Sequence, residues 1–368
     1  MSKNQIPKTN EQKKEEIITT NRCLIELTER KTPNNFKRNI IMISKISKIF
    51  PDNFISGTVK NREELNDAFL KYPNFSKTYI QTALYWEDNR KWYEDNWLKV
   101  YKYLDKNFLE KFQTETEHRS RAWEFHLAVV LIDKCFNLEE KTWKTGPDFC
   151  IKTLTGKKIW IEAIACDLGN VDPVEPYPDM KSGEIYSFGG NIEDIHRPRA
   201  LRITSAIGTK FEIFKKYLKD FKSGVTKNDC LLIAINGVAI QHFTDPRMLF
   251  KRSVFGQGPD VLVRVQGREK LKGGFYKPTP TIVKKKGISE EKIPANFMEM
   301  NEFSKISAVL YCGHTVSHSW MNGFNVGDDF LFAYHANSDN PIPKNFFKFG
   351  RGIRKNIKSG SISDREQK

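Results

Sequence analysis

The chain has 368 residues, enough for one large domain or two ordinary ones, and its 39% hydrophobic content can fill a core. Sixty Lys and Arg against 45 Asp and Glu give a net charge of +15, which attracts polyanions such as nucleic acid, although a generally lysine-rich surface would give the same excess. No stretch approaches a membrane span and no signal peptide is recognisable, which excludes a membrane partner and makes a cytoplasmic location the expectation.

The N-terminal third is predicted to be helical after a disordered arm. Residues 1–15 have almost no apolar side chains, so they cannot offset the entropy lost on ordering. Residues 16–115 are expected to form a helical region, since from Arg62 onward apolar residues recur at three- and four-residue spacing. Aromatic residues here alternate with lysines and could stack single-stranded bases, but at helical spacing they more often belong to the core. They are Trp86, Trp92, Trp97, Tyr101 and Tyr103.

Residues 116–350 are predicted to form a mixed α/β domain. A helix is expected over 117–136, and two short β-rich runs, 148–154 and 157–165, are separated by the turn residues Thr155 and Gly156, which is typical of a hairpin. A helix over 202–221 and a buried strand over 230–240 follow. Further strands are expected at 305–312 and 329–336, a Gly- and Lys-rich loop at 256–286, and a basic flexible tail at 351–368.

Two carboxylates on the predicted hairpin are candidates for a metal site. Asp148 opens the first strand after the turn-forming Gly146 and Pro147, and Glu162 stands in the apolar run IWIEAIA of the second. A carboxylate in such a run is costly unless it is paired or bound to a metal. Antiparallel pairing would bring the two acids nearly opposite each other, where one Mg²⁺ or Mn²⁺ could bridge them. Glu124, in the preceding helix, could add a third acid.

This order of a helix acid, GPD at a strand, an acid on the next strand, a helix and a buried strand resembles the PD-(D/E)XK restriction-endonuclease-like superfamily. It is similar, more narrowly, to uncharacterised bacterial proteins with a GPDF and IWIEA pair. The likeness covers about 117–236. It implies a mixed sheet flanked by helices, Asp148 and Glu162 as Mg²⁺ ligands, Glu124 as an accessory acid, and the backbone carbonyl of Ala163 as a further ligand.

The sequence departs from the superfamily at the motif lysine. The position two residues after the second acid holds Ile164. Some members take the lysine from the following helix, and Lys210 is the candidate here, with Arg202 as a phosphate contact on the same helix. The competing interpretation is that Lys210 is a solvated helix residue.

Two other features have both a functional and a structural interpretation. His314 and His318 have a spacing that suits Zn²⁺ on a helix, with Cys312 or His335 as partners, but their segment contains Gly313 and follows a predicted strand, which favours a loop. Lys251 and Arg252 begin a basic, glycine-containing segment that could follow a phosphate backbone or simply be solvated.

The sequence therefore predicts a metal-dependent nuclease, with catalytic residues Glu124, Asp148, Glu162 and Lys210. The alternative is a catalytically inactive nuclease-like protein that binds nucleic acid or a protein partner, for which the missing motif lysine is the main argument. Nothing in the sequence distinguishes DNA from RNA or reveals the oligomeric state.

Overall fold

The structure is a computed structural model, and it describes nine stretches of the chain. They are residues 48–51, 59–170, 192–240, 246–263, 272–286, 289–314, 327–343, 345–355 and 362–366. The predicted disordered arm, 1–15, lies outside them. None of the helices in these stretches has the length and apolar content that crossing a bilayer requires.

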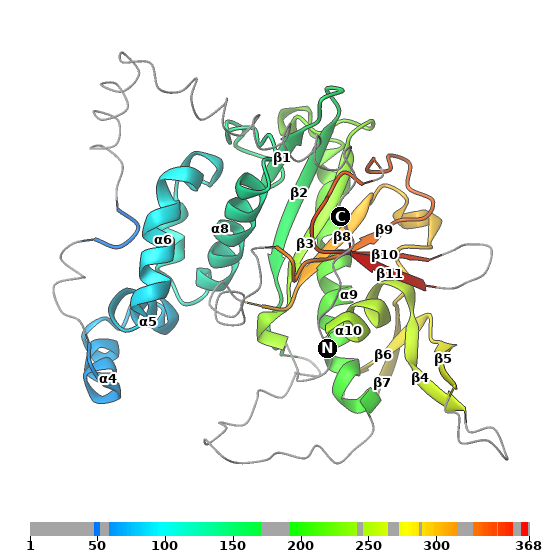
Figure 1. The fold of residues 1–368 in the computed structure, drawn as a ribbon, viewed down its shortest axis with the longest axis horizontal. Coiled ribbons are helices and arrows are strands. Elements are labelled where there is room, and N and C mark those ends of the chain that lie inside the picture. Colours follow the sequence, from blue (N-terminus) through cyan, green and yellow to red (C-terminus); the bar gives the residue numbers. More distant parts are fainter. Residues whose placement is uncertain are drawn as a thin grey trace, which may run out of the picture.

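The described part of the N-terminal region, from residue 59 onward, is helical, as predicted (Figure 1). Asn61 and Ser76 cap α4 and α5 with side-chain oxygens that accept backbone N–H groups. The core interpretation of the aromatic residues holds for Trp97, which is 7% exposed and stacks on Phe108, whereas Trp86 at the start of α6 is 38% exposed. The elements are α4 (Arg62–Lys71), α5 (Lys77–Leu84), α6 (Glu87–Val100), η1 (Tyr101–Tyr103) and α7 (Phe108–Phe112).

A seven-stranded mixed sheet forms the centre of the molecule, in the order β1-β2-β3-β8-β9-β10-β11. The predicted hairpin pairs β1 with β2 antiparallel, and β2, β3 and β8 run parallel to one another. β9 is antiparallel to β8, β10 is parallel to β9, and β11 is antiparallel to β10. The strands are β1 (Phe149–Lys152), β2 (Lys158–Ala165), β3 (Cys230–Asn236), β8 (Ala308–Cys312), β9 (Leu331–Tyr334), β10 (Arg351–Lys355) and β11 (Ile362–Glu366).

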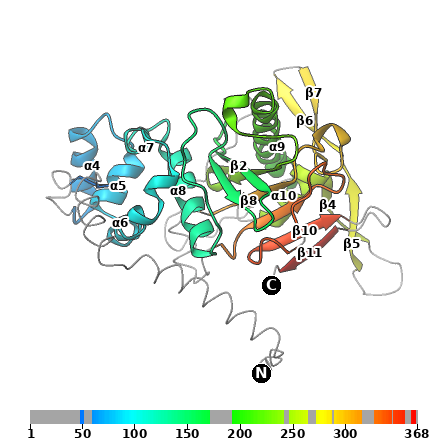
Figure 2. The same cartoon turned by 90° about the horizontal axis from the view of Figure 1, so that it is seen from above.

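Helices cover both faces of this sheet, so alternate residues of β2 enter two separate apolar cores (Figures 1 and 2). Ile159, Ile161 and Ala163 pack in the core that contains α8 (His118–Asp133) and the N-terminal helices. Trp160 and Ile164 belong to the other core, under α9 (Ile192–Tyr217) and α10 (Pro246–Phe255). Glu162 therefore stands on the α9 side of the strand. The short helices η2 (Phe221–Ser223), η3 (Val238–Ile240) and η4 (Asn301–Phe303) connect these elements.

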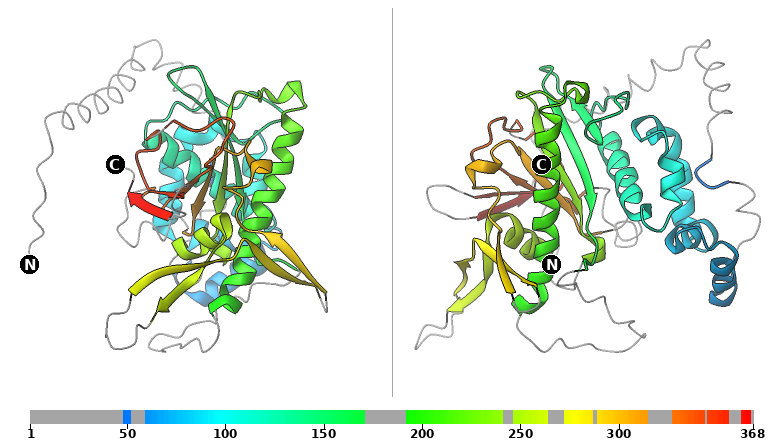
Figure 3. Two further views of the ribbon diagram at one scale, coloured as in Figure 1. Left: turned by 90° about the vertical axis from the view of Figure 1, so that its right-hand side faces the viewer. Right: turned by 180° about the vertical axis from the view of Figure 1, so that it is seen from behind.

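The predicted loop over 256–286 is wrong, because the described part of this segment is largely β-strand. Two hairpins, β4 with β5 and β6 with β7, follow α10 and lie near the N-terminal end of α9, where Arg197 donates to the Val283 carbonyl of β6 (Figure 3). In the β6–β7 hairpin, Lys284 and Lys285 stand opposite Glu291 and Glu290. These strands therefore pair through opposite charges at positions where an alternation of apolar and polar residues would have predicted a strand. The strands are β4 (Gln257–Val263), β5 (Lys272–Pro278), β6 (Thr281–Lys286) and β7 (Ser289–Pro294).

The basic flexible tail predicted for 351–368 is also wrong for two of its segments, since β10 and β11 extend the sheet. In β10 only Ile353 is buried, so the strand has little hydrophobic pattern to reveal it. The predicted fold class, a mixed sheet flanked by helices with a helical N-terminal region, is confirmed.

Candidate metal and phosphodiesterase site

A fixed turn places Asp148 at the start of β1. Gly146 has φ 144°, and a Cβ there would lie 2.9 Å from the Trp143 ring, so glycine is needed at this position. The Trp143 indole N–H donates to the Pro147 carbonyl at 2.7 Å, and its ring stands edge-on to Trp160. The turn is thus anchored to the body of the hairpin immediately before the acid.

Asp148 and Glu162 meet across this hairpin. β1 pairs Phe149 with Ile161, and continuing this register by one residue sets Asp148 opposite Glu162, as predicted. The Asp148 carboxylate turns back to the strand, where its Oδ2 accepts the Ala163 backbone N–H at 2.8 Å. Ala163 therefore orients Asp148 through its amide group.

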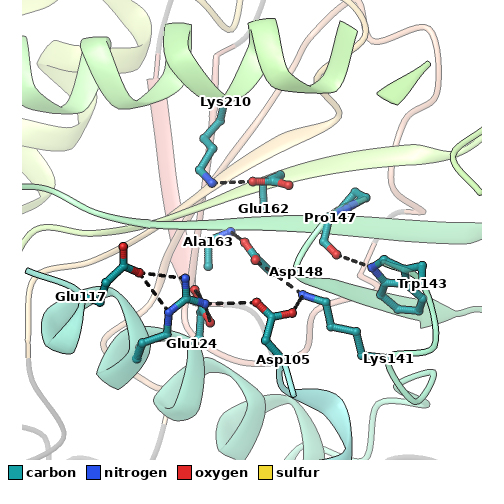
Figure 4. A network of polar contacts seen from close by, with 11 residues as sticks. Asp105, Glu117, Glu124, Lys141, Trp143, Pro147, Asp148, Glu162, Ala163 and Lys210 are labelled. Carbon is teal, nitrogen blue, oxygen red and sulfur yellow. Dashed lines mark hydrogen bonds and ion pairs between the residues drawn. The ribbon is translucent and has the colours of Figure 1, made fainter. Parts of the chain in front are cut away.

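Lys210 approaches Glu162 from α9 (Figure 4). Its Nζ lies 2.5 Å from Glu162 Oε2, and the two side chains are 16% and 3% exposed. This contact rules out the interpretation of Lys210 as a solvated helix residue. Tyr217, seven residues further along the same face of α9, also lies near Glu162 and lowers the pKa of that carboxyl. It is a residue that the sequence prediction lacks, although its spacing from Lys210 is a usable signal.

Glu124 reaches the site from α8, on the other side of β2 (Figure 4). Arg121 stands one turn before it and donates to both of its oxygens, at 2.9 and 2.6 Å. Arg121 also donates to Glu117 at 3.0 Å. The sequence analysis did not select Arg121, although a cation three residues from a buried helix acid is an expected partner.

Two further charged residues complete the network, and no local pattern predicts them. Lys141, in the segment before β1, places its Nζ 2.7 Å from Asp105 Oδ1 and 3.9 Å from Asp148 Oδ1. Asp105, which follows η1, also lies 3.4 Å from Arg121. These contacts bring the N-terminal helical region to the acids of the hairpin.

Burial, reinforced by the charge on Asp148, raises two pKa values in this network. Burial raises the pKa of Glu124 to about 8, the charge on Asp148 adds to the effect, and Arg121 offsets only part of it. Burial and the charge on Asp148 likewise raise the pKa of Glu162 to about 7, against the opposing effect of Lys210. The Lys210 pKa is raised, because nearby carboxylates outweigh the effect of its burial. Acids with raised pKa values on one side of a site are common where a cation or proton is exchanged.

The donor set suits a hard divalent cation. Within the stretches that the structure describes, no three His, Cys, Asp or Glu side chains gather in a position to hold a metal ion. Mg²⁺ needs fewer protein ligands, since it keeps several waters and is commonly held by one or two carboxylates together with substrate phosphates. Asp148 and Glu162 supply two carboxylates whose mutual repulsion a cation would relieve. The ligand role expected for the Ala163 carbonyl remains a prediction.

The three predicted nucleic-acid contacts lie in different surroundings. Arg252 is a wrong prediction, because it is 5% exposed and donates to the carbonyls of Thr279 and Thr281, where it fixes the start of β6. Lys251 is partly exposed. Arg202 packs against Gly169, where any Cβ would collide with its guanidinium. Arg202 thus lies on α9 at the end of β2, two turns before Lys210.

Of the two histidines for which the sequence favours a loop over a zinc site, the structure describes only His314. His314 follows β8 directly in irregular backbone, and its Nδ1 lies 3.3 Å from Asp329 Oδ2, the oxygen that Cys312 also contacts. His335 is directed instead to the carbonyl of Met300. His318 lies outside the described residues. The loop interpretation therefore holds for His314.

Comparisons of the chain with protein-family models, with curated proteins and with solved structures find no match.

Proposed function

We propose that the chain is a metal-dependent nucleic-acid phosphodiesterase whose site is built on Asp148, Glu162 and Lys210. The observation that carries the proposal is the contact between the Lys210 ammonium and Glu162, at 2.5 Å, across from Asp148. It supplies an acid pair with a neighbouring ammonium although the motif position itself holds Ile164. The net charge of +15 supports a polyanionic substrate.

Each side chain has a distinct part in the proposed reaction. Asp148 and Glu162 would hold Mg²⁺ or Mn²⁺, which when bound lowers the pKa of water and offsets charge on phosphate. Lys210 would donate hydrogen bonds to the attacking water or to a phosphate oxygen, because its ammonium is fixed and stays protonated. Glu124, which accepts from Arg121 through both of its oxygens, would support the site as the accessory acid.

The test removes the acids without changing side-chain size. Asp148→Asn and Glu162→Gln should abolish metal-dependent cleavage of a mixture of DNA and RNA and weaken Mn²⁺ binding in calorimetry. Lys210→Met should lower cleavage by about 10²-fold or more, the usual contribution of such a group. Glu212→Gln is the matched control, since Glu212 is an exposed acid on α9 that pairs with Lys215. Undiminished cleavage in both acid variants would sink the proposal.

A non-catalytic nucleic-acid-binding protein is the second candidate, favoured by Ile164 at the motif position. It predicts binding that falls steeply with salt but persists in EDTA and in both acid variants, because its phosphate contacts would be electrostatic. Binding without any metal-dependent cleavage would select this candidate.

A further inference from the structure

The segment before β1 joins the N-terminal helical region to the hairpin. The backbone N–H of Lys141 donates to the Lys102 carbonyl at 3.2 Å, and the Lys102 ammonium lies 2.6 Å from Glu140. On the other side, Glu139 accepts from Lys158 of β2 at 3.0 Å. The backbone of Lys141 is therefore held in place independently of where its ammonium is directed.

That ammonium forms a short ion pair with Asp105 and a long one with Asp148 (Figure 4). The distance of 2.7 Å to Asp105 is a charge-assisted hydrogen bond, whereas 3.9 Å to Asp148 is beyond hydrogen-bond range. The Lys141 side chain is only 10% exposed, so water screens these interactions weakly. A flexible lysine that lost Asp105 would have Asp148 as a near alternative partner.

Asp105 is well suited to retain this partner. Burial by itself would raise its pKa, but Lys141 and Arg121 outweigh that effect and hold the pKa below its usual value. Asp105 is therefore an anion at neutral pH. Its other contact, with Arg121 at 3.4 Å, fixes it beside α8.

We propose that Asp105 is a positioning residue that holds the Lys141 ammonium out of hydrogen-bond range of Asp148 and so keeps that carboxylate available to a divalent cation. An ammonium paired with Asp148 would compete with the cation for the same oxygens. The metal part of this inference rests on the proposed function, whereas the competition between two carboxylates for Lys141 does not. The helical N-terminal region would thereby control a site that lies on the hairpin.

The first experiment measures Mn²⁺ affinity by calorimetry at pH 8 on the full chain. Asp105→Asn should weaken binding about tenfold, the size expected for one partly buried ion pair formed at a ligand. Lys141→Met should bind at least as tightly as the wild type, and Asp105→Asn with Lys141→Met should recover wild-type affinity. Glu140→Gln removes a salt bridge between the same two segments and should change nothing.

Two outcomes would overturn the inference. Unchanged affinity in Asp105→Asn would mean that Lys141 does not move, and a double variant as weak as Asp105→Asn would mean that Asp105 only holds the helices. A measurement without metal separates this inference from the proposed function. A double-mutant cycle of Lys141→Met and Asp148→Asn in urea unfolding gives the coupling free energy between Lys141 and Asp148, in the wild type and in Asp105→Asn. A larger coupling in Asp105→Asn supports the inference even if the wild type binds no Mn²⁺, and an equal coupling in the two backgrounds refutes it.

Discussion

Replacing Lys210 by Met should destabilise the protein by an amount that increases with pH. Glu162 is 2% exposed and would lose its cation, and leaving one buried charge unpaired costs about 3–5 kcal/mol. The pKa of Glu162 is about 7 with Lys210 present and would be higher without it, because Lys210 favours the ionised form. Below pH 7 both proteins bury a largely protonated carboxyl. We therefore expect a loss of only about 1 kcal/mol at pH 6.

Above pH 7 the free energies of unfolding of the wild type and of Lys210→Met diverge. The wild type ionises Glu162 beside Lys210, whereas the variant must keep the carboxyl protonated, which costs about 1.4 kcal/mol for each pH unit above 7. The loss should thus reach about 3–4 kcal/mol at pH 9, measured by urea unfolding at both pH values. Lys215→Met is the control: its partner Glu212 is exposed, so its removal should cost below about 0.5 kcal/mol at either pH. An equal loss for Lys210→Met at pH 6 and pH 9 would refute the reasoning.

Three further outcomes are expected. The folded pKa values of Glu162 and Glu124 are raised from 4.5 to about 7 and about 8. Without metal, the free energy of unfolding should therefore fall as pH rises between 4.5 and 8. Saturating Mn²⁺ should flatten this pH dependence in thermal unfolding. Arg252→Met should lower the urea midpoint by an amount equivalent to about 2–4 kcal/mol. It should leave nucleic-acid binding by the folded protein unchanged in filter assays, and weakened binding would restore Arg252 as a contact. Gly146→Ala should cost about 1–3 kcal/mol in unfolding, since its Cβ would strike Trp143, and should weaken Mn²⁺ binding; wild-type values for both would contradict the role given to this turn.

The part of the site that the sequence predicts is the part built from local pattern. The hairpin follows from two β-rich runs around Thr155 and Gly156, and its register sets Asp148 opposite Glu162. Lys210 was nominated from the resemblance, because some members of the superfamily take the lysine from the following helix. That helix crosses back over the sheet to reach the parallel strand β3, which brings Lys210 to Glu162.

The remaining residues depend on tertiary contacts that no spacing encodes. Asp105 and Lys141 meet only because η1 and the segment before β1 dock through Lys102 and Glu140. The β6–β7 hairpin escaped prediction for a different reason: of the described β6 side chains only Ile282 is buried, and the Lys and Glu residues around it leave no visible period of two.

The charge balance supports the proposal that the site works without a lysine at Ile164. That side chain packs under α9, on the same face as Glu162, where Lys210 already delivers an ammonium. Among the groups joined by the contacts of this network, five carboxylates face three cations. The carboxyl groups thus exceed the cations by two, and burial, together with the charge on Asp148, raises the pKa values of Glu124 and Glu162. One divalent cation would neutralise that excess, whereas a second lysine at Ile164 would compete with it for the same carboxylates.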